Sequence, residues 1–76
     1  MAPRNYVELY RQAAEQGHAL AQRRLGARYE AGRGGLAKDE ARAVELWRQA
    51  AEQGDADAQF FLGVMYATGS VGWKSR

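Results

Sequence analysis

The chain has 76 residues, a formal net charge of +2, no cysteine and a single histidine. These values exclude a disulfide-stabilised domain and a metal site built from thiolates or several imidazoles, so a metal would need carboxylates alone. No apolar stretch of about 18 residues is present to span a bilayer, and no apolar signal segment opens the chain, so we expect a cytoplasmic protein without membrane contact.

The charge is distributed unevenly between the two halves of the chain. Residues 1–37 carry six arginines and three acidic side chains, a balance of +3. Residues 38–76 carry five basic and six acidic side chains, a balance of −1. A basic first half indicates a partner with an acidic surface.

The string RQAAEQG occurs twice, at residues 11–17 and 48–54. With the same offset of 37 positions, residues 7–36 align with residues 44–73 and are identical at 18 of 30 positions. A period of this length indicates a repeat architecture, in which each unit buries its apolar face against its neighbours. We therefore expect one structural unit that is used twice.

The first unit predicts two helices separated by a glycine. Apolar residues in helical spacing define the first helix, which Pro3 opens and Gly17 ends in a left-handed conformation. His18 is the expected cap of the second helix, and a weaker one than aspartate. The residues of that helix expected to face inward recur every four positions and are Ala21, Leu25 and Tyr29.

A glycine-rich connection leads to the second unit, which repeats this order. Asp39 caps its first helix, Gly54 ends that helix, and Asp55 caps the next one. Gly26 and Gly63 stand at equivalent positions of the two second helices, and we expect both to let antiparallel backbones approach closely. The inward residues of the last helix are predicted to be Ala58, Leu62 and Tyr66.

These residues resemble the Sel-one-like repeat, a relative of the tetratricopeptide repeat. The pattern is an alanine pair and a glycine, then alanine-glutamine, leucine-glycine, tyrosine, glycine and a later aspartate; it runs through YRQAAEQGHALAQRRLGARYEAGRGG, DEARAVELW and WRQAAEQGDADAQFFLGVMYATG. The resemblance implies an all-α fold, a right-handed α/α solenoid of two antiparallel helix pairs that assembles other proteins and has no shared catalytic residue. We expect a single module over residues 1–76, with repeat one at about 3–35, repeat two at about 39–72 and a tail at 69–76.

One departure from the family pattern lies in the second helix of repeat one, where arginines replace aromatic and large apolar residues. Guanidinium groups bind carboxylates in a fixed geometry, so this basic face is a candidate site for a protein with an acidic surface. A solvated helix face is the alternative. No nucleic-acid-binding motif accompanies the arginines, so direct nucleic-acid binding is not expected. The candidate residues are Arg23, Arg24, Arg28 and Arg33.

The other departure lies in the second helix of repeat two, whose apolar arc covers about 240° of a helical wheel and is followed by no capping helix. Exposed apolar surface marks an interaction site, and we expect a second copy of the chain to cover it in a two-fold dimer. A foreign protein is the alternative occupant. The residues concerned are Phe60, Phe61, Val64, Met65 and Trp73.

The expected function is that of a non-catalytic adaptor or scaffold that binds other proteins. The alternative is a stand-alone inhibitor or regulator, of the kind carried by mobile elements, that sterically blocks a larger protein or nucleoprotein complex. The resemblance implies a concave recognition surface on the first helices of the repeats. Its expected polar contacts are Arg4, Glu8, Arg11, Glu45 and Arg48.

Catalytic readings of the sequence fail on spacing and partners. GRGGLAKDE lacks the lysine and hydroxyl residue of a phosphate-binding loop, and GSVGWKS is too short and follows a predicted helix instead of a strand. His18 has no serine or cysteine partner outside the tail. We therefore expect no enzyme activity and no cofactor.

Overall fold

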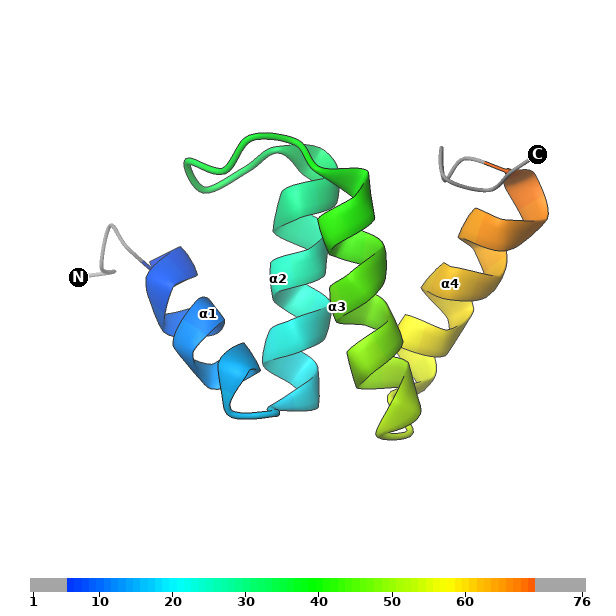
Figure 1. The fold of residues 1–76 in the computed structure, drawn as a ribbon, viewed down its shortest axis with the longest axis horizontal. Helices are drawn as coiled ribbons and strands as arrows, with labels where there is room; N and C mark the ends of the chain where they lie inside the picture. Colours follow the sequence, from blue (N-terminus) through cyan, green and yellow to red (C-terminus); the bar gives the residue numbers. More distant parts are fainter. Residues whose placement is uncertain (1–5, 70–76) are drawn as a thin grey trace.

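The computed structural model describes residues 6–69, which form four α-helices (Figure 1). The helices are α1 (Tyr6–Glu15), α2 (Ala19–Ala31), α3 (Glu40–Glu52) and α4 (Ala56–Thr68). They stand in one row, each antiparallel to the one before it, and each packs on its neighbour in the sequence, α2 and α3 most extensively. The predicted all-α fold with antiparallel helix pairs is confirmed.

The ends of the helices follow the local signals in the sequence. Asp39 and Asp55 are the N-caps of α3 and α4, and the backbone N–H of Ala58 donates to Asp55 Oδ1 at 2.9 Å. At the equivalent position before α2, Nδ1 of His18 accepts from the N–H of Ala21 at 3.3 Å. A carboxylate is the better acceptor for an N–H that has no partner at a helix start. The shorter distance at Asp55 than at His18 agrees with the prediction that histidine is the weaker cap.

Two equivalent glycines turn the chain between the helices of each pair. Gly17 and Gly54 have φ values of 91° and 93°, a left-handed conformation that a Cβ atom disfavours. The prediction that these residues end the first-type helices α1 and α3 is confirmed.

Glutamine side chains repeat the same tie in both units. Nε2 of Gln22 donates to the carbonyl of Ala14 at 3.1 Å, and 37 positions later Nε2 of Gln59 donates to the carbonyl of Ala51 at 3.2 Å. Gln22 is buried, and its Oε1 also accepts from Nε2 of Gln53 at 2.8 Å. Because both polar ends of this buried amide have partners, the hydrogen bonds offset the cost of its burial, and the amide links α1 and α2 to the C-cap residue of α3.

The core consists of two apolar clusters, one on each side of the contact between α2 and α3. The cluster among α1, α2 and α3 contains Val7, Ala14, Ala21, Leu25 and Leu46. The cluster among α3, α4 and the facing side of α2 contains Ala43, Val44, Trp47, Ala50, Ala58 and Met65. Small alanines at the helix contacts keep the layers close and make the core thin, so each large side chain in it matters for stability.

A close helix contact joins Trp47 of α3 to Gly26 of α2. A Cβ atom at Gly26 would lie 2.5 Å from Trp47 Nε1 and 2.8 Å from its Cδ1, which leaves no room for a side chain. The same Nε1 donates to the carbonyl of Arg23 at 3.0 Å. Gly26 therefore makes room for an indole ring, whereas the sequence predicted the close approach of two backbones.

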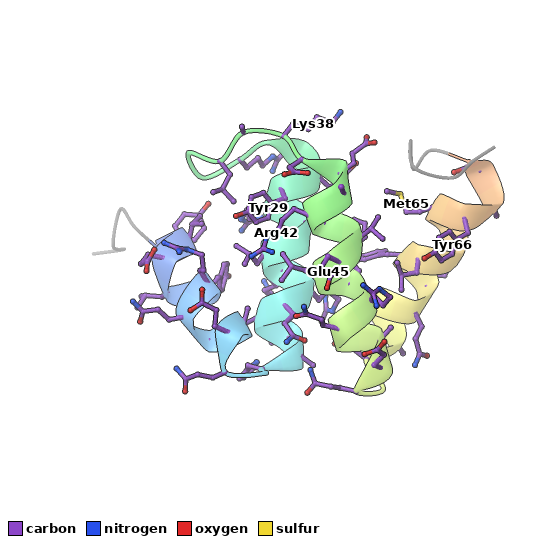
Figure 2. All side chains as sticks on the ribbon, viewed as in Figure 1. Tyr29, Lys38, Arg42, Glu45, Met65 and Tyr66 are labelled. Atoms are coloured by element: carbon purple, nitrogen blue, oxygen red, sulfur yellow. The ribbon has the colours of Figure 1, made fainter. Side chains whose placement is uncertain are left out.

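Two predictions for α4 are wrong for a single reason. A Cβ atom at Gly63 would meet nothing within 4 Å, so no backbone approaches it closely. Tyr66, predicted to face inward, is 46 % exposed. Its equivalent Tyr29 packs against both core clusters and lies under the guanidinium of Arg42 at 5.8 Å (Figure 2). α2 has a packed helix on each side, whereas α4 packs mainly on α3 within residues 6–69.

The two equivalent glycines provide a direct test of this packing. Gly26→Ala forces a Cβ against the indole ring, and we expect it to lower the free energy of unfolding by about 1–3 kcal/mol. Gly63→Ala meets no neighbour and removes backbone freedom from the unfolded chain, so we expect a gain of about 0.5–1 kcal/mol. Urea unfolding followed by circular dichroism in dilute solution measures both. Equal effects at the two sites would contradict the packing.

Asp55 contributes stability that depends on pH. Its pKa is held below the ordinary value of 3.8, chiefly because the N–H of Ala58 donates to the carboxylate, and the ion pair with Arg23 adds to the shift against the opposing effect of desolvation. A carboxylate with a lowered pKa stabilises the fold at any pH above its ordinary pKa. This stabilisation is lost as the pH falls from the ordinary pKa through the lowered one.

We expect Asp55→Ala to cost about 1–2 kcal/mol at neutral pH, because the cap and the ion pair are both lost. Asp55→Asn is the matched control, since asparagine caps a helix as well as aspartate does but has no charge to titrate. Urea unfolding at about pH 7 and about pH 3 should show a larger acid loss for the wild-type chain than for Asp55→Asn. An identical acid loss in the two chains would show that the carboxylate charge contributes nothing.

Candidate functional site

The arginines predicted to form one basic face of α2 are held in three different ways. Nε of Arg23 lies 3.0 Å from Asp55 Oδ1, and its Nη1 lies 3.5 Å from Asp57 Oδ2. The side chain of Arg23 is only 22 % exposed. Its charge is therefore paired within the chain, where it ties α2 to the start of α4.

Arg28 stacks on the aromatic rings of α1. Its Cζ lies 5.4 Å from the centre of the Tyr6 ring and 5.9 Å from that of Tyr10, distances at which a guanidinium is attracted to the π-face. Its Nε is buried and has no hydrogen-bond partner among the described residues. Arg28 occupies the position that Met65 has in repeat two, so it fills an apolar position with its stem and stacks its charged end.

Arg24 is exposed and lies beside these two arginines. A shallow groove of about 250 Å³ is lined by Arg23, Arg24, Ala27, Arg28 and Phe61. Arg33 is exposed in the connection after α2 and does not line this groove. The structure thus brings three of the four predicted arginines to one depression and leaves the fourth outside it.

An apolar groove of about 270 Å³ adjoins the basic one between α2 and α4. It shares Ala27 and Phe61 with the basic groove, so the two form one surface with a basic part and an apolar part. We call this surface the α2–α4 groove. The residues of its apolar part are Ala27, Glu30, Trp47, Phe60, Phe61, Val64 and Met65.

The residues predicted for self-association divide between the core and the surface. The ring of Phe61 lies 5.2 Å from that of Trp47, centre to centre, and Met65 is buried in the core cluster of α3 and α4. Phe60 and Val64 are 67 % and 42 % exposed. Trp73 lies outside the described residues. The apolar arc of α4 is therefore covered by α3 on one side and open on the other.

The first-type helices α1 and α3 carry the same ion pair at equivalent positions. Arg11 pairs with Glu8 in α1, and Arg48 pairs with Glu45 in α3. Gln12 donates to Glu8 at 3.3 Å, as Gln49 does to Glu45. Each pair is internal to one helix, so a partner at this surface has to compete for charges that already have a neighbour. Arg4, the remaining residue predicted here, lies outside the described residues.

Several residues of the surface were not predicted from the sequence. Trp47 is buried in the core and also lines the apolar groove. Leu9 and Leu20 are exposed on α1 and α2. The internal alignment at an offset of 37 held a signal for both, since it pairs them with Leu46 and Asp57, which contact residues of α2.

Two further properties bear on what the site contains. No helix within residues 6–69 is both long and apolar enough to cross a membrane. In the same part of the chain, histidine, aspartate and glutamate side chains form no group of three or more that would suit a metal ion.

The Sel1 repeat model matches the chain at residues 7–18, 19–55 and 56–76. The central match covers α2, the connection and α3, and its length equals the 37-residue period of the internal alignment. The flanking matches are shorter and fall on α1 and on α4 with the residues after it. No curated protein matched the chain. With the period, the helix pairs and the family pattern in agreement over most of its length, the chain belongs to the Sel1 repeat family.

Proposed function

We propose that this chain is a non-catalytic protein-interaction module that binds an acidic segment of a partner protein in the α2–α4 groove. Sel1 repeats generally serve as protein-interaction scaffolds and are typically non-catalytic. The observation that carries the specific proposal is the juxtaposition of three guanidinium groups with an apolar groove on the same surface.

The basic part of the groove suits a carboxylate. Arg24 is exposed, and a guanidinium donates two parallel hydrogen bonds to a carboxylate. Nε of Arg28 is a buried donor that lacks an acceptor among residues 6–69, a state that costs free energy until an acceptor arrives. Arg23 is already paired with Asp55 and Asp57, so it contributes less to binding a further carboxylate than Arg24 and Arg28 do.

The apolar part of the groove suits a bulky side chain next to that carboxylate. Phe60 is largely exposed, and the edge of Trp47 forms part of the groove lining. Burying one large apolar side chain there contributes about 1.5–3 kcal/mol. The groove therefore favours a segment that carries aspartate or glutamate beside an aromatic or large aliphatic residue.

Self-association through repeat two is a second part of the proposal. Phe60 and Val64 are exposed beside each other on α4, and exposed apolar patches are typical of protein interfaces. An inhibitor or regulator of a larger complex would use the same surfaces as an adaptor. The two differ in whether the partner loses its activity on binding.

A display library of random short peptides, selected on the immobilised chain, tests the groove without a known partner. We expect enrichment of peptides in which an acidic residue adjoins a bulky apolar one. Arg24→Glu should weaken binding of the selected peptides by about tenfold or more, because a charge-assisted hydrogen bond worth about 1.5–3 kcal/mol is replaced by repulsion.

Arg48→Glu is the matched control, since it makes the same charge change on the exposed surface of α3. It should leave peptide binding unchanged. If Arg48→Glu abolished binding and Arg24→Glu did not, the recognition surface would lie on the first-type helices. Enrichment of basic peptides would contradict the proposal altogether.

A further inference from the structure

We propose that copies of this chain associate head to tail, with α1 of one copy packed on α4 of the next in the way that α3 packs on α2 within the chain. The inference rests on the proposed self-association and specifies its faces and geometry. It replaces the two-fold dimer expected from the sequence with a heterologous contact, in which two different faces meet.

The donor helix of this contact is α1, which is almost a copy of α3. Residues 7–17 and 44–54 differ only at Tyr10 and Trp47. α3 packs on α4 with one face and on α2 with another, whereas α1 packs mainly on α2 among the described helices. The second face of α1 is consequently open. Leu9 is 53 % exposed there, while its equivalent Leu46 is 3 % exposed against α2.

The acceptor helix is α4, whose open face repeats the surface on which α3 rests. In α2 that surface is Gly26, which receives the ring of Trp47. The equivalent Gly63 of α4 has nothing within 4 Å of a Cβ position. Tyr10 of the next copy is a smaller ring than Trp47, so the space over Gly63 accommodates it.

The residues around this contact have changed together between the repeats. Within the chain, Nη1 of Arg23 lies 3.5 Å from Asp57 Oδ2, so the contact of α2 with the start of α4 is ionic. In the proposed junction Phe60 takes the position of Arg23, and Leu20 of the next copy takes the position of Asp57. An ionic pair is thus replaced on both sides by apolar side chains, which preserves chemical complementarity.

The same substitution extends to the helix cap. Asp55, the second carboxylate that Arg23 contacts, is replaced at the junction by His18 of the next copy. An imidazole packs on the ring of Phe60 without the cost of burying an unpaired carboxylate. At the junction, therefore, the position of Arg23 and the positions of both its carboxylate partners hold residues without a carboxylate or guanidinium group.

Every large apolar side chain that is exposed within residues 6–69 falls on this junction. Val64 and Tyr66 are the equivalents of Ala27 and Tyr29, which pack against the cluster around Trp47. A two-fold contact between α4 helices would leave the exposed leucines of α1 and α2 uncovered. The set covered by the head-to-tail contact is Leu9, Leu20, Phe60, Val64 and Tyr66.

A heterologous contact leaves one unoccupied face at each end of an assembly, so further copies can add. The product is a ring if the geometry closes and a linear chain if it does not. Light scattering coupled to size exclusion, from micromolar to millimolar concentration, measures this. We expect a mass that rises beyond two copies for the wild-type chain.

Two variants isolate the two faces. Leu9→Arg disables the α1 face and Phe60→Arg disables the α4 face, and both positions are exposed in the single chain, so the fold is kept. Each variant alone should associate about tenfold more weakly or not at all. Their equimolar mixture should form a one-to-one complex, because each supplies the face that the other lacks. Ala31→Arg, which adds the same charge at an exposed position away from both faces, should associate like the wild type.

A rescue variant tests the matched chemistry. In Phe60→Arg combined with His18→Asp and Leu20→Asp, the new guanidinium faces two new carboxylates, as Arg23 does within the chain. Association should return, and circular dichroism should show equal helix content in all variants. Aspartate is also a good helix cap, so these changes do not oppose folding.

Three results would overturn the inference. The first is a well-folded wild-type monomer at every concentration, and the second is a dimer whose affinity does not change in Leu9→Arg. The third is the absence of a complex in the mixture of Leu9→Arg and Phe60→Arg. The first would also remove the proposed self-association. The second and third would remove only the head-to-tail geometry. Phe60 and Val64 belong both to the α2–α4 groove and to the head-to-tail contact, so the next copy would compete with a bound peptide. Leu9→Arg leaves the groove residues unchanged and removes the competing copy, so the peptide affinity of this variant reports on the groove alone.

Discussion

The indole ring of Trp47 is the contact on which the arrangement of the helices depends. It lies on Gly26 of α2, where any side-chain carbon would clash, and its Nε1 donates to the carbonyl of Arg23 at 3.0 Å. The ring of Phe61 in α4 lies 5.2 Å away. One side chain therefore joins three helices. Its buried N–H also fixes the rotation of α3 against α2, because a buried donor has to keep its acceptor.

The two repeats use the same positions for different chemistry around this ring. Arg28 stacks on tyrosines in repeat one, while its equivalent Met65 lies in the apolar core. Stacking on aromatic faces lets a guanidinium occupy a position that otherwise takes an aliphatic side chain. The α2–α4 groove consequently receives arginines from one repeat and aromatic and aliphatic side chains from the other. Its mixed character arises from the difference between the repeats and not from what they share.

A helix in a repeat array has two packing faces, and in residues 6–69 only α2 and α3 have both occupied. Leu9 and Leu46 lie in nearly identical helices, yet one is exposed and the other is buried. The burial of a residue here is thus a property of its position in the row of helices. This is why a periodic sequence produces open apolar faces at the outer helices from the same residues that form the core at the centre.

The sequence by itself determined the four helices, their caps at Asp39 and Asp55, the glycine turns and the repeat family, because caps and periodicity act over a few residues and the period is visible in the letters. It did not determine the environments of Gly63 and Tyr66, which the repeat pattern placed in a contact that α4 does not make. Nor did it show that Arg23 pairs with a carboxylate 32 positions away. Only the tertiary structure decided these points, since the charge and exposure of a side chain depend on which helix lies against it.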